Sequence, residues 1–68
     1  MSGFKKGDRV FWWFKNGRAY SSAVSGVVRQ EGTITRVRTG RGRFHAEIKA
    51  DDDPGRTLTL TTYILHKV

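Results

Sequence analysis

The stretch Arg43-Phe-His-Ala-Glu-Ile-Lys-Ala50 decides the fold class of this chain, because its apolar and polar side chains alternate without a break. Every second residue from Phe44 to Ala50 is apolar and would face one side of an extended strand. The residues between them, from Arg43 to Lys49, would face the other side. A helix would need apolar residues three and four positions apart, and no segment of ten or more residues keeps that spacing. The chain is therefore predicted to be all-β.

Downstream of this strand, the sequence predicts a turn, a second strand and a short closing segment. Asp51-Asp-Asp-Pro-Gly55 carries the residues typical of a turn. Arg56 to Thr61 alternates leucine with threonine, a pattern typical of a half-buried strand. A single turn of tight helix at 62–64 and a strand from Leu65 to Val68 are predicted to end the chain.

Upstream, two further strands are predicted on either side of a segment that lacks clear alternation. Glu31 to Arg38 is predicted to be a strand that ends at the turn Thr39-Gly-Arg-Gly42. Asp8 to Phe14 is predicted to be the first strand, and Asn16-Gly17 after it favours a tight turn. Residues 18–30 are rich in small residues and are predicted to form a long excursion with short hairpin arms of its own.

Five short strands, a long early loop, two tight turns and a late kink match the layout of a five-stranded SH3-like barrel. Residues 1–7 are predicted to be a lead-in, and residues 8–68 a single domain. There are no cysteines, so neither disulfides nor thiolate metal sites stabilise the fold, which favours a reducing, cytoplasmic location. The apolar cluster from Val10 to Phe14 is too short to span a membrane, and a soluble protein is expected.

The framework strands resemble those of known small barrels. Lys6-Gly-Asp-Arg-Val-Phe-Trp12 resembles the first strand of many bacterial Tudor-like and KOW-like domains. Glu31-Gly-Thr-Ile34 is similar to the start of their second strand, and Leu65-His-Lys-Val68 to their closing strand. Among these families, the hypervirulence-associated Tudor-like domains are the most similar. The resemblance implies a small barrel and leaves its function open.

A weaker resemblance is to the plasmid-borne type II dihydrofolate reductases, in which SH3-like barrels form a tetrameric pore. Gly7-Asp-Arg-Val10 and Pro54-Gly55 lie in similar places in this chain. The substrate motif of that family, Val-Gln-Ile-Tyr, should follow the Pro-Gly pair. This chain has Thr57-Leu-Thr-Leu60 there, so the reductase activity and its cofactors are not expected.

The strongest functional signal is a set of basic residues around the predicted turn at 39–42. The chain carries 13 Lys and Arg against 6 Asp and Glu, a net charge of +7. Guanidinium groups bind phosphate with two parallel hydrogen bonds, and glycines let a ligand approach the backbone closely. The residues predicted to contact nucleic-acid phosphates are Arg36, Arg38, Arg41, Arg43 and Lys49. A solvated, purely structural hairpin face is the alternative.

Aromatic residues give a second signal. Phe11-Trp-Trp-Phe14 cannot be buried as a whole, since consecutive side chains of a strand face opposite sides. With Trp12 and Phe14 in the core, Phe11 and Trp13 would point outward, and exposed aromatic rings stack on bases or enclose a methylated cation. Burial under the long loop or in a subunit interface is the other interpretation.

Enzymatic chemistry finds little support. The only histidines, His45 and His66, are expected to be solvated, and no metal-ligand spacing links them to Asp51–Asp53. The aspartates are expected to bond nearby backbone amides in their turn. We therefore expect a non-enzymatic binding module without metal or cofactor. Its expected partner is DNA or RNA; the alternative is a protein- or peptide-binding, or self-associating, adaptor barrel. The oligomeric state is left open.

Overall fold

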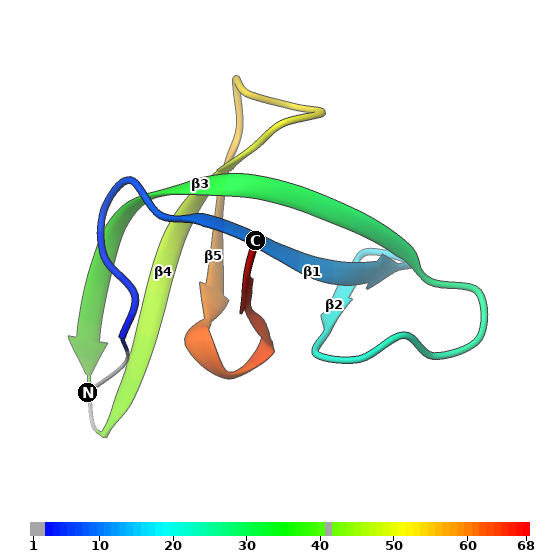
Figure 1. The fold of residues 1–68 in the computed structure, drawn as a ribbon, viewed down its shortest axis with the longest axis horizontal. Coiled ribbons are helices and arrows are strands. Elements are labelled where there is room, and N and C mark those ends of the chain that lie inside the picture. Colours follow the sequence, from blue (N-terminus) through cyan, green and yellow to red (C-terminus); the bar gives the residue numbers. More distant parts are fainter. Residues whose placement is uncertain (1–2, 41) are drawn as a thin grey trace.

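The computed structural model describes residues 3–40 and 42–68, which form one curled antiparallel sheet (Figure 1). Along the chain the elements are β1 (Arg9–Lys15), β2 (Arg18–Tyr20), β3 (Val28–Gly40), β4 (Arg43–Ala50), β5 (Thr57–Thr61), the 3-10 turn η1 (Thr62–Ile64) and β6 (His66–Lys67). The strand order across the sheet is β2-β1-β3-β4-β5, and β6 pairs with β1. None of the described residues forms a helix long and apolar enough to cross a membrane.

The long strand β3 gives the sheet its curvature, because its first half pairs with one neighbour and its second half with another. β1 pairs with β3 from Val28 to Thr33, and β4 pairs with it from Gly32 to Gly40. Only Gly32 and Thr33 pair on both sides in these registers. The sheet bends there into a half-barrel, in which β5 pairs with β4 alone (Figure 1).

The core fills the concave side of the half-barrel, as the alternation predicts. Its largest fully buried side chains are Trp12, Ile34, Ile48 and Val10. Smaller buried residues complete it, namely Ala46, Ala50 and Leu65. All of the strand residues among these occupy inward positions, so the side opposite the core, here called the outer face, carries the polar set.

Several predicted elements are confirmed. β4 has the predicted bounds, β5 lies within the predicted strand, and η1 is the predicted tight turn before the closing strand. Asn16 and Gly17 both have positive φ, 49° and 80°, as a tight hairpin turn between β1 and β2 requires.

Three expectations need correction. The sheet has six strands, because part of the predicted excursion at 18–30 pairs with β1 as β2. β3 begins at Val28, three residues before the predicted Glu31, because the main chain of residues 28–30 continues the ladder with β1 despite poor alternation. Thr39 and Gly40 belong to β3, since the hairpin to β4 stays paired as far as Gly40 and Arg43.

Candidate nucleic-acid interface

A β-bulge in β3 places the predicted arginines on the outer face. Ile34 points into the core, so strict alternation would direct Arg36 inward as well. The register with β4 shifts between Ile34 and Arg36, where Thr35 is an extra residue. After it, the residues of β3 that would have faced the core face outward, and the reverse. Thr35 also donates a hydrogen bond from its hydroxyl to the Glu47 carbonyl of β4, at 3.1 Å. Val37 consequently packs against the core, and the arginines on either side of it point outward.

The register of β3 and β4 brings the predicted basic residues together. Arg36 lies opposite Glu47, Arg38 opposite His45, and Gly40 opposite Arg43. Lys49, opposite Thr33, continues the same row of outward positions. We call the outer surface of β3, β4 and β5 that carries Arg36, Arg38, Arg43 and Lys49 the basic face. Arg41, predicted with this group, lies outside the described residues.

Most of these cations are uncommitted. Arg38 Nε lies 2.8 Å from a Glu47 carboxylate oxygen and is 56% exposed in its side chain. Among the described residues, Arg36, Arg43 and Lys49 form no ion pair, and all three are exposed. Three basic side chains on this face can therefore reach an external anion without breaking an internal contact.

The rest of the basic face is hydroxylic rather than acidic. The outward residues of β5 are Thr57, Thr59 and Thr61, opposite Lys49, Glu47 and His45 of β4. Glu47 is the one carboxylate on β4 and β5. Glu31 of β3 and Asp51 both pair with Arg9, which also bonds Thr33 opposite Lys49. Hydroxyl groups donate to phosphate as side-chain partners, so the face offers both charge and hydrogen-bond donors.

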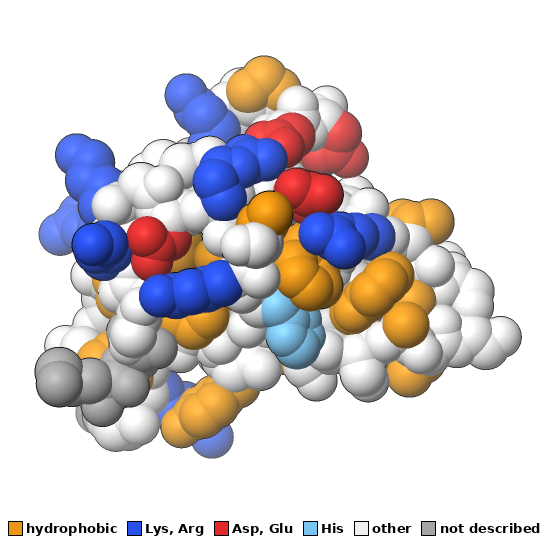
Figure 2. Space-filling model, in the orientation of Figure 1, with side chains coloured by type: hydrophobic (Ala, Val, Ile, Leu, Met, Phe, Trp, Pro, Cys, Tyr) orange, Lys and Arg blue, Asp and Glu red, His pale blue; other side chains and the backbone are white. Residues whose placement is uncertain are grey.

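Three cations near β1 and β6, by contrast, are paired with carboxylates. Arg9 donates to both carboxylate oxygens of Asp51, at 2.8 and 2.5 Å, and lies 3.6 Å from Glu31. Arg29 lies 3.4 Å from Glu31, and Lys67 pairs with Asp8. Figure 2 shows this side of the molecule, where acidic and basic side chains are interspersed around hydrophobic side chains and a histidine.

The predicted aromatic residues point outward as expected, but Phe11 is already covered. His66 stacks on the Phe11 ring at 5.0 Å between centroids, and the Arg29 guanidinium lies 3.9 Å from the ring centroid. These neighbours come from β6 and β3, on opposite edges of β1, so they enclose the ring from two sides. Trp13 meets Phe11 edge-on at 6.3 Å and pairs across strands with Tyr20. Trp13 is therefore the better placed of the two for an external ligand.

The aromatic group and the arginines of the basic face share the outer surface but lie toward opposite ends of β3, with Lys49 between them opposite Thr33. Trp13 is opposite Arg29 at the start of β3, whereas Arg38 lies near its end. Nine residue steps separate positions 29 and 38, which is about 30 Å of extended strand. A single nucleotide cannot contact both, so they would form two subsites rather than one.

Both histidines are less exposed than expected. His66 is half-buried by its stacking on Phe11, and its Nε2 forms a hydrogen bond with the Ser21 carbonyl oxygen. His45 is half-buried between Arg38 and Thr61 on neighbouring strands. The expectation that both are simply solvated is wrong, because cross-strand neighbours cover them. No group of three or more potential metal ligands occurs among the described residues.

The aspartates of the 51–55 turn do not serve the turn in the predicted way. Asp51 bonds Arg9 of β1, and Asp52 accepts a hydrogen bond from the Gln30 amide at 3.2 Å. The turn is held by its backbone instead, through Asp53 N to Ala50 O and Arg56 N to Asp53 O. Side chains of this loop thus fasten it to β1 and β3.

The Arg9–Asp51 pair makes a testable prediction about pH. The hydrogen bond and charge of Arg9 lower the pKa of Asp51 below its ordinary value. A carboxyl whose pKa is depressed by folding stabilises the folded state above its unfolded pKa, and that contribution is lost as pH falls through the folded value. NMR titration of the Asp51 side-chain carboxyl carbon is expected to give a low pKa that rises in Arg9→Gln. An unchanged Asp51 pKa in that variant would contradict the pairing.

Comparison with protein-family models, with curated proteins and with solved structures finds no match for this chain.

Proposed function

We propose that this chain is a non-enzymatic nucleic-acid-binding module that contacts the phosphate backbone through the basic face. The observation that carries the proposal is the cluster of cations that the β3–β4 register brings together on the outer surface. Arg36, Arg43 and Lys49 are exposed and unpaired among the described residues, while Arg9 and Arg29, beside one another at β1 and β3, are matched with carboxylates. Several unpaired cations held close together raise the local concentration of polyanions.

The fold we propose is an SH3-like barrel, to which the strand order lends support. After β1, a long excursion leads to three consecutive antiparallel strands, β3, β4 and β5. A 3-10 turn then leads to β6, which returns to pair with β1. This is the arrangement expected from the resemblance to Tudor-like and KOW-like domains, with β2 as an addition inside the excursion.

The proposed binding mode is recognition of backbone and shape rather than of base sequence. The basic face offers guanidinium, ammonium and hydroxyl donors, which contact phosphate and sugar and carry no sequence information directly. Trp13 forms a second subsite for stacking on a base, about 30 Å from Arg38 along β3, with Lys49 between them at the level of Thr33. A ligand that reaches from Trp13 to Arg38 along β3 would span roughly nine base pairs, or an equivalent length of single strand.

The test is to change charge on and off the basic face by the same amount. Arg36→Gln with Arg43→Gln removes two exposed cations from the face, and Arg18→Gln with Arg56→Gln removes two exposed cations from elsewhere. Fluorescence polarisation with single- and double-stranded oligonucleotides, titrated with protein at several salt concentrations, reads out both double variants. The first is expected to weaken binding about tenfold or more and to reduce the slope of log K against log salt by about 2. The control should lose much less.

Two results would contradict this proposal. Equal losses in both double variants would reduce the binding to a net-charge effect. Binding that is absent in the unmodified protein at near-physiological salt would remove nucleic acid as the partner. The search would then turn to a protein or peptide partner of the Trp13 cluster, for which Trp13→Ala is the first variant to examine.

A further inference from the structure

The two strands that end the sheet path differ sharply in their protection. β2 has three residues and carries Arg18, and a short, charged edge strand resists pairing with other chains. β5 has five residues, Thr-Leu-Thr-Leu-Thr, and pairs with β4 alone. It is the one strand among the described residues without a charged side chain, in a protein whose net charge is +7. Its β-branched threonines also favour extended pairing.

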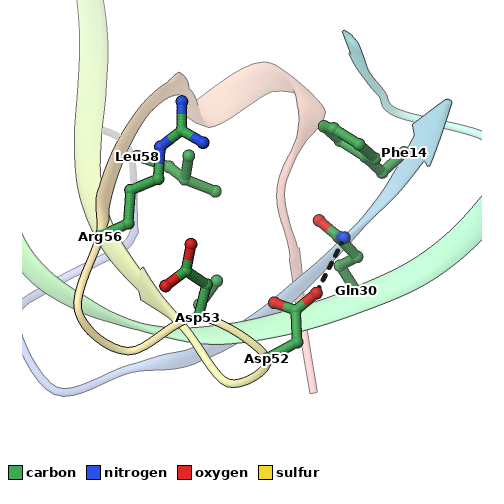
Figure 3. A pocket seen from close by; sticks show the side chains of 7 residues that line it. Phe14, Gln30, Asp52, Asp53, Arg56 and Leu58 are labelled. Carbon is green, nitrogen blue, oxygen red and sulfur yellow. Dashed lines mark hydrogen bonds between the residues drawn. The ribbon is translucent and has the colours of Figure 1, made fainter. Parts of the chain in front are cut away.

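An apolar hollow lies beside this edge on the inner side of the sheet (Figure 3). Phe14, Ala50 and Leu58 supply its apolar lining, and polar residues of the 51–56 loop surround it together with Gln30. Leu58 and Leu60 of β5 are only half-buried, because no other described strand pairs with the second edge of β5. An added strand at the β5 edge would complete the sheet and cover these leucines.

We propose that two copies of this chain associate through an antiparallel pairing of their β5 strands. The sequence of β5 is self-complementary about Thr59. A two-fold axis there sets Thr59 opposite the partner's Thr59, and Leu58 opposite the partner's Leu60 on the inner side. Threonine–threonine and leucine–leucine cross-strand pairs are favourable, and no like charges face one another across the seam. We take the occupant to be a second copy because β5 matches itself in this register. It also carries no charge that would repel its duplicate in so basic a protein.

The basic faces do not oppose this arrangement. Lys49 of each copy lies on β4, so β5 of both copies separates the two lysines. Three inter-strand spacings amount to about 14 Å, which exceeds the Debye length of about 10 Å at 0.1 M salt. Repulsion between the faces is therefore largely screened. The pairing would instead join the two outer surfaces into one continuous sheet, with Thr57, Thr59 and Thr61 at its centre.

The test measures mass without any nucleic acid, so its outcome is independent of the proposed function. Light scattering coupled to size-exclusion chromatography, from low micromolar to millimolar protein, is expected to show the average mass rising from 7.7 kDa toward twice that value. Thr59→Lys places a lysine on the outer side, opposite Glu47 of its own chain, so the isolated fold keeps a favourable neighbour. In the dimer it faces its duplicate, and the dimer dissociation constant should rise about tenfold or more.

Ser22→Lys is the matched control, since it adds the same charge at an exposed loop position and should leave the dissociation constant unchanged. Hydrogen exchange gives a second measurement on the unmodified protein: amides of β5 should become protected as concentration rises. A constant monomer mass over the whole range would overturn the proposal. Dimerisation of Thr59→Lys as strong as that of the unmodified protein, with no concentration-dependent protection in β5, would overturn it as well.

Discussion

Gly32→Ala is expected to destabilise the protein by about 3 kcal/mol or more, which for a domain of this size is most or all of its stability. A Cβ at Gly32 would lie 2.7 Å from both Ile48 Cγ2 and the Lys49 carbonyl oxygen, and 3.2 Å from Ala50 Cα. Two of these three atoms belong to the backbone of β4 and cannot rotate away. Relief would require β4 to move off β3 at the point where the sheet bends most.

Gly40→Ala is the matched control, because Gly40 lies on the same strand with nothing within 4 Å of its added Cβ. Its effect should stay within about 0.5 kcal/mol. Urea or thermal unfolding followed by circular dichroism measures both variants. Similar, small losses at the two positions would show that β3 and β4 can separate at Gly32 without cost, against the close approach described above.

Trp12→Ala is expected to cost about 3–5 kcal/mol, the second large effect, because Trp12 is fully buried at the centre of the core. Trp13→Ala changes the adjacent residue in the same way on the outer face, where the ring is only half-buried. Its cost should be less than half as large. Denaturant unfolding of the two variants side by side tests whether the core or the outer aromatic group stabilises β1.

Trp12→Phe separates two contributions within this residue. The Trp12 Nε1 hydrogen is buried and has no acceptor within the described part of the chain. An unpaired buried donor costs roughly 1–3 kcal/mol, so phenylalanine removes a penalty while it loses some packing. We expect a net loss of about 1 kcal/mol for Trp12→Phe, well below that of Trp12→Ala. Equal losses for both would indicate that the indole N–H is satisfied in solution.

Local patterns predicted the strands whose side chains alternate clearly. β4 could be predicted from its own residues, since the alternation from Arg43 to Ala50 distinguishes the buried face from the exposed one. β2 and the start of β3 were not resolved, because pairing with β1 determines them and small residues there hide the period. The bulge at Thr35 could be inferred from the spacing of Ile34 and Val37, which fits one face only with an extra residue between them.

The candidate site was predictable in content but not in arrangement. The turn at 39–42 was enough to place Arg36, Arg38 and Arg43 near one another. That Trp13 lies at the far end of the same face depends on the register between β1 and β3, which no local pattern contains. The pair of Arg9 and Asp51 joins residues 42 positions apart and follows only from the folded sheet.

The pairing of β1 with β6 has a consequence for synthesis of this protein. β1 contains the most apolar run of the chain, Phe11-Trp-Trp-Phe14, and it is synthesised before β3 and β6. Its partners arrive later: β3 begins at Val28, and β6 is formed by His66 and Lys67. Between the synthesis of β1 and that of β6, the nascent chain therefore carries an apolar segment whose pairing is incomplete. We expect holdase chaperones to recognise that segment and to release it once β6 has paired with β1.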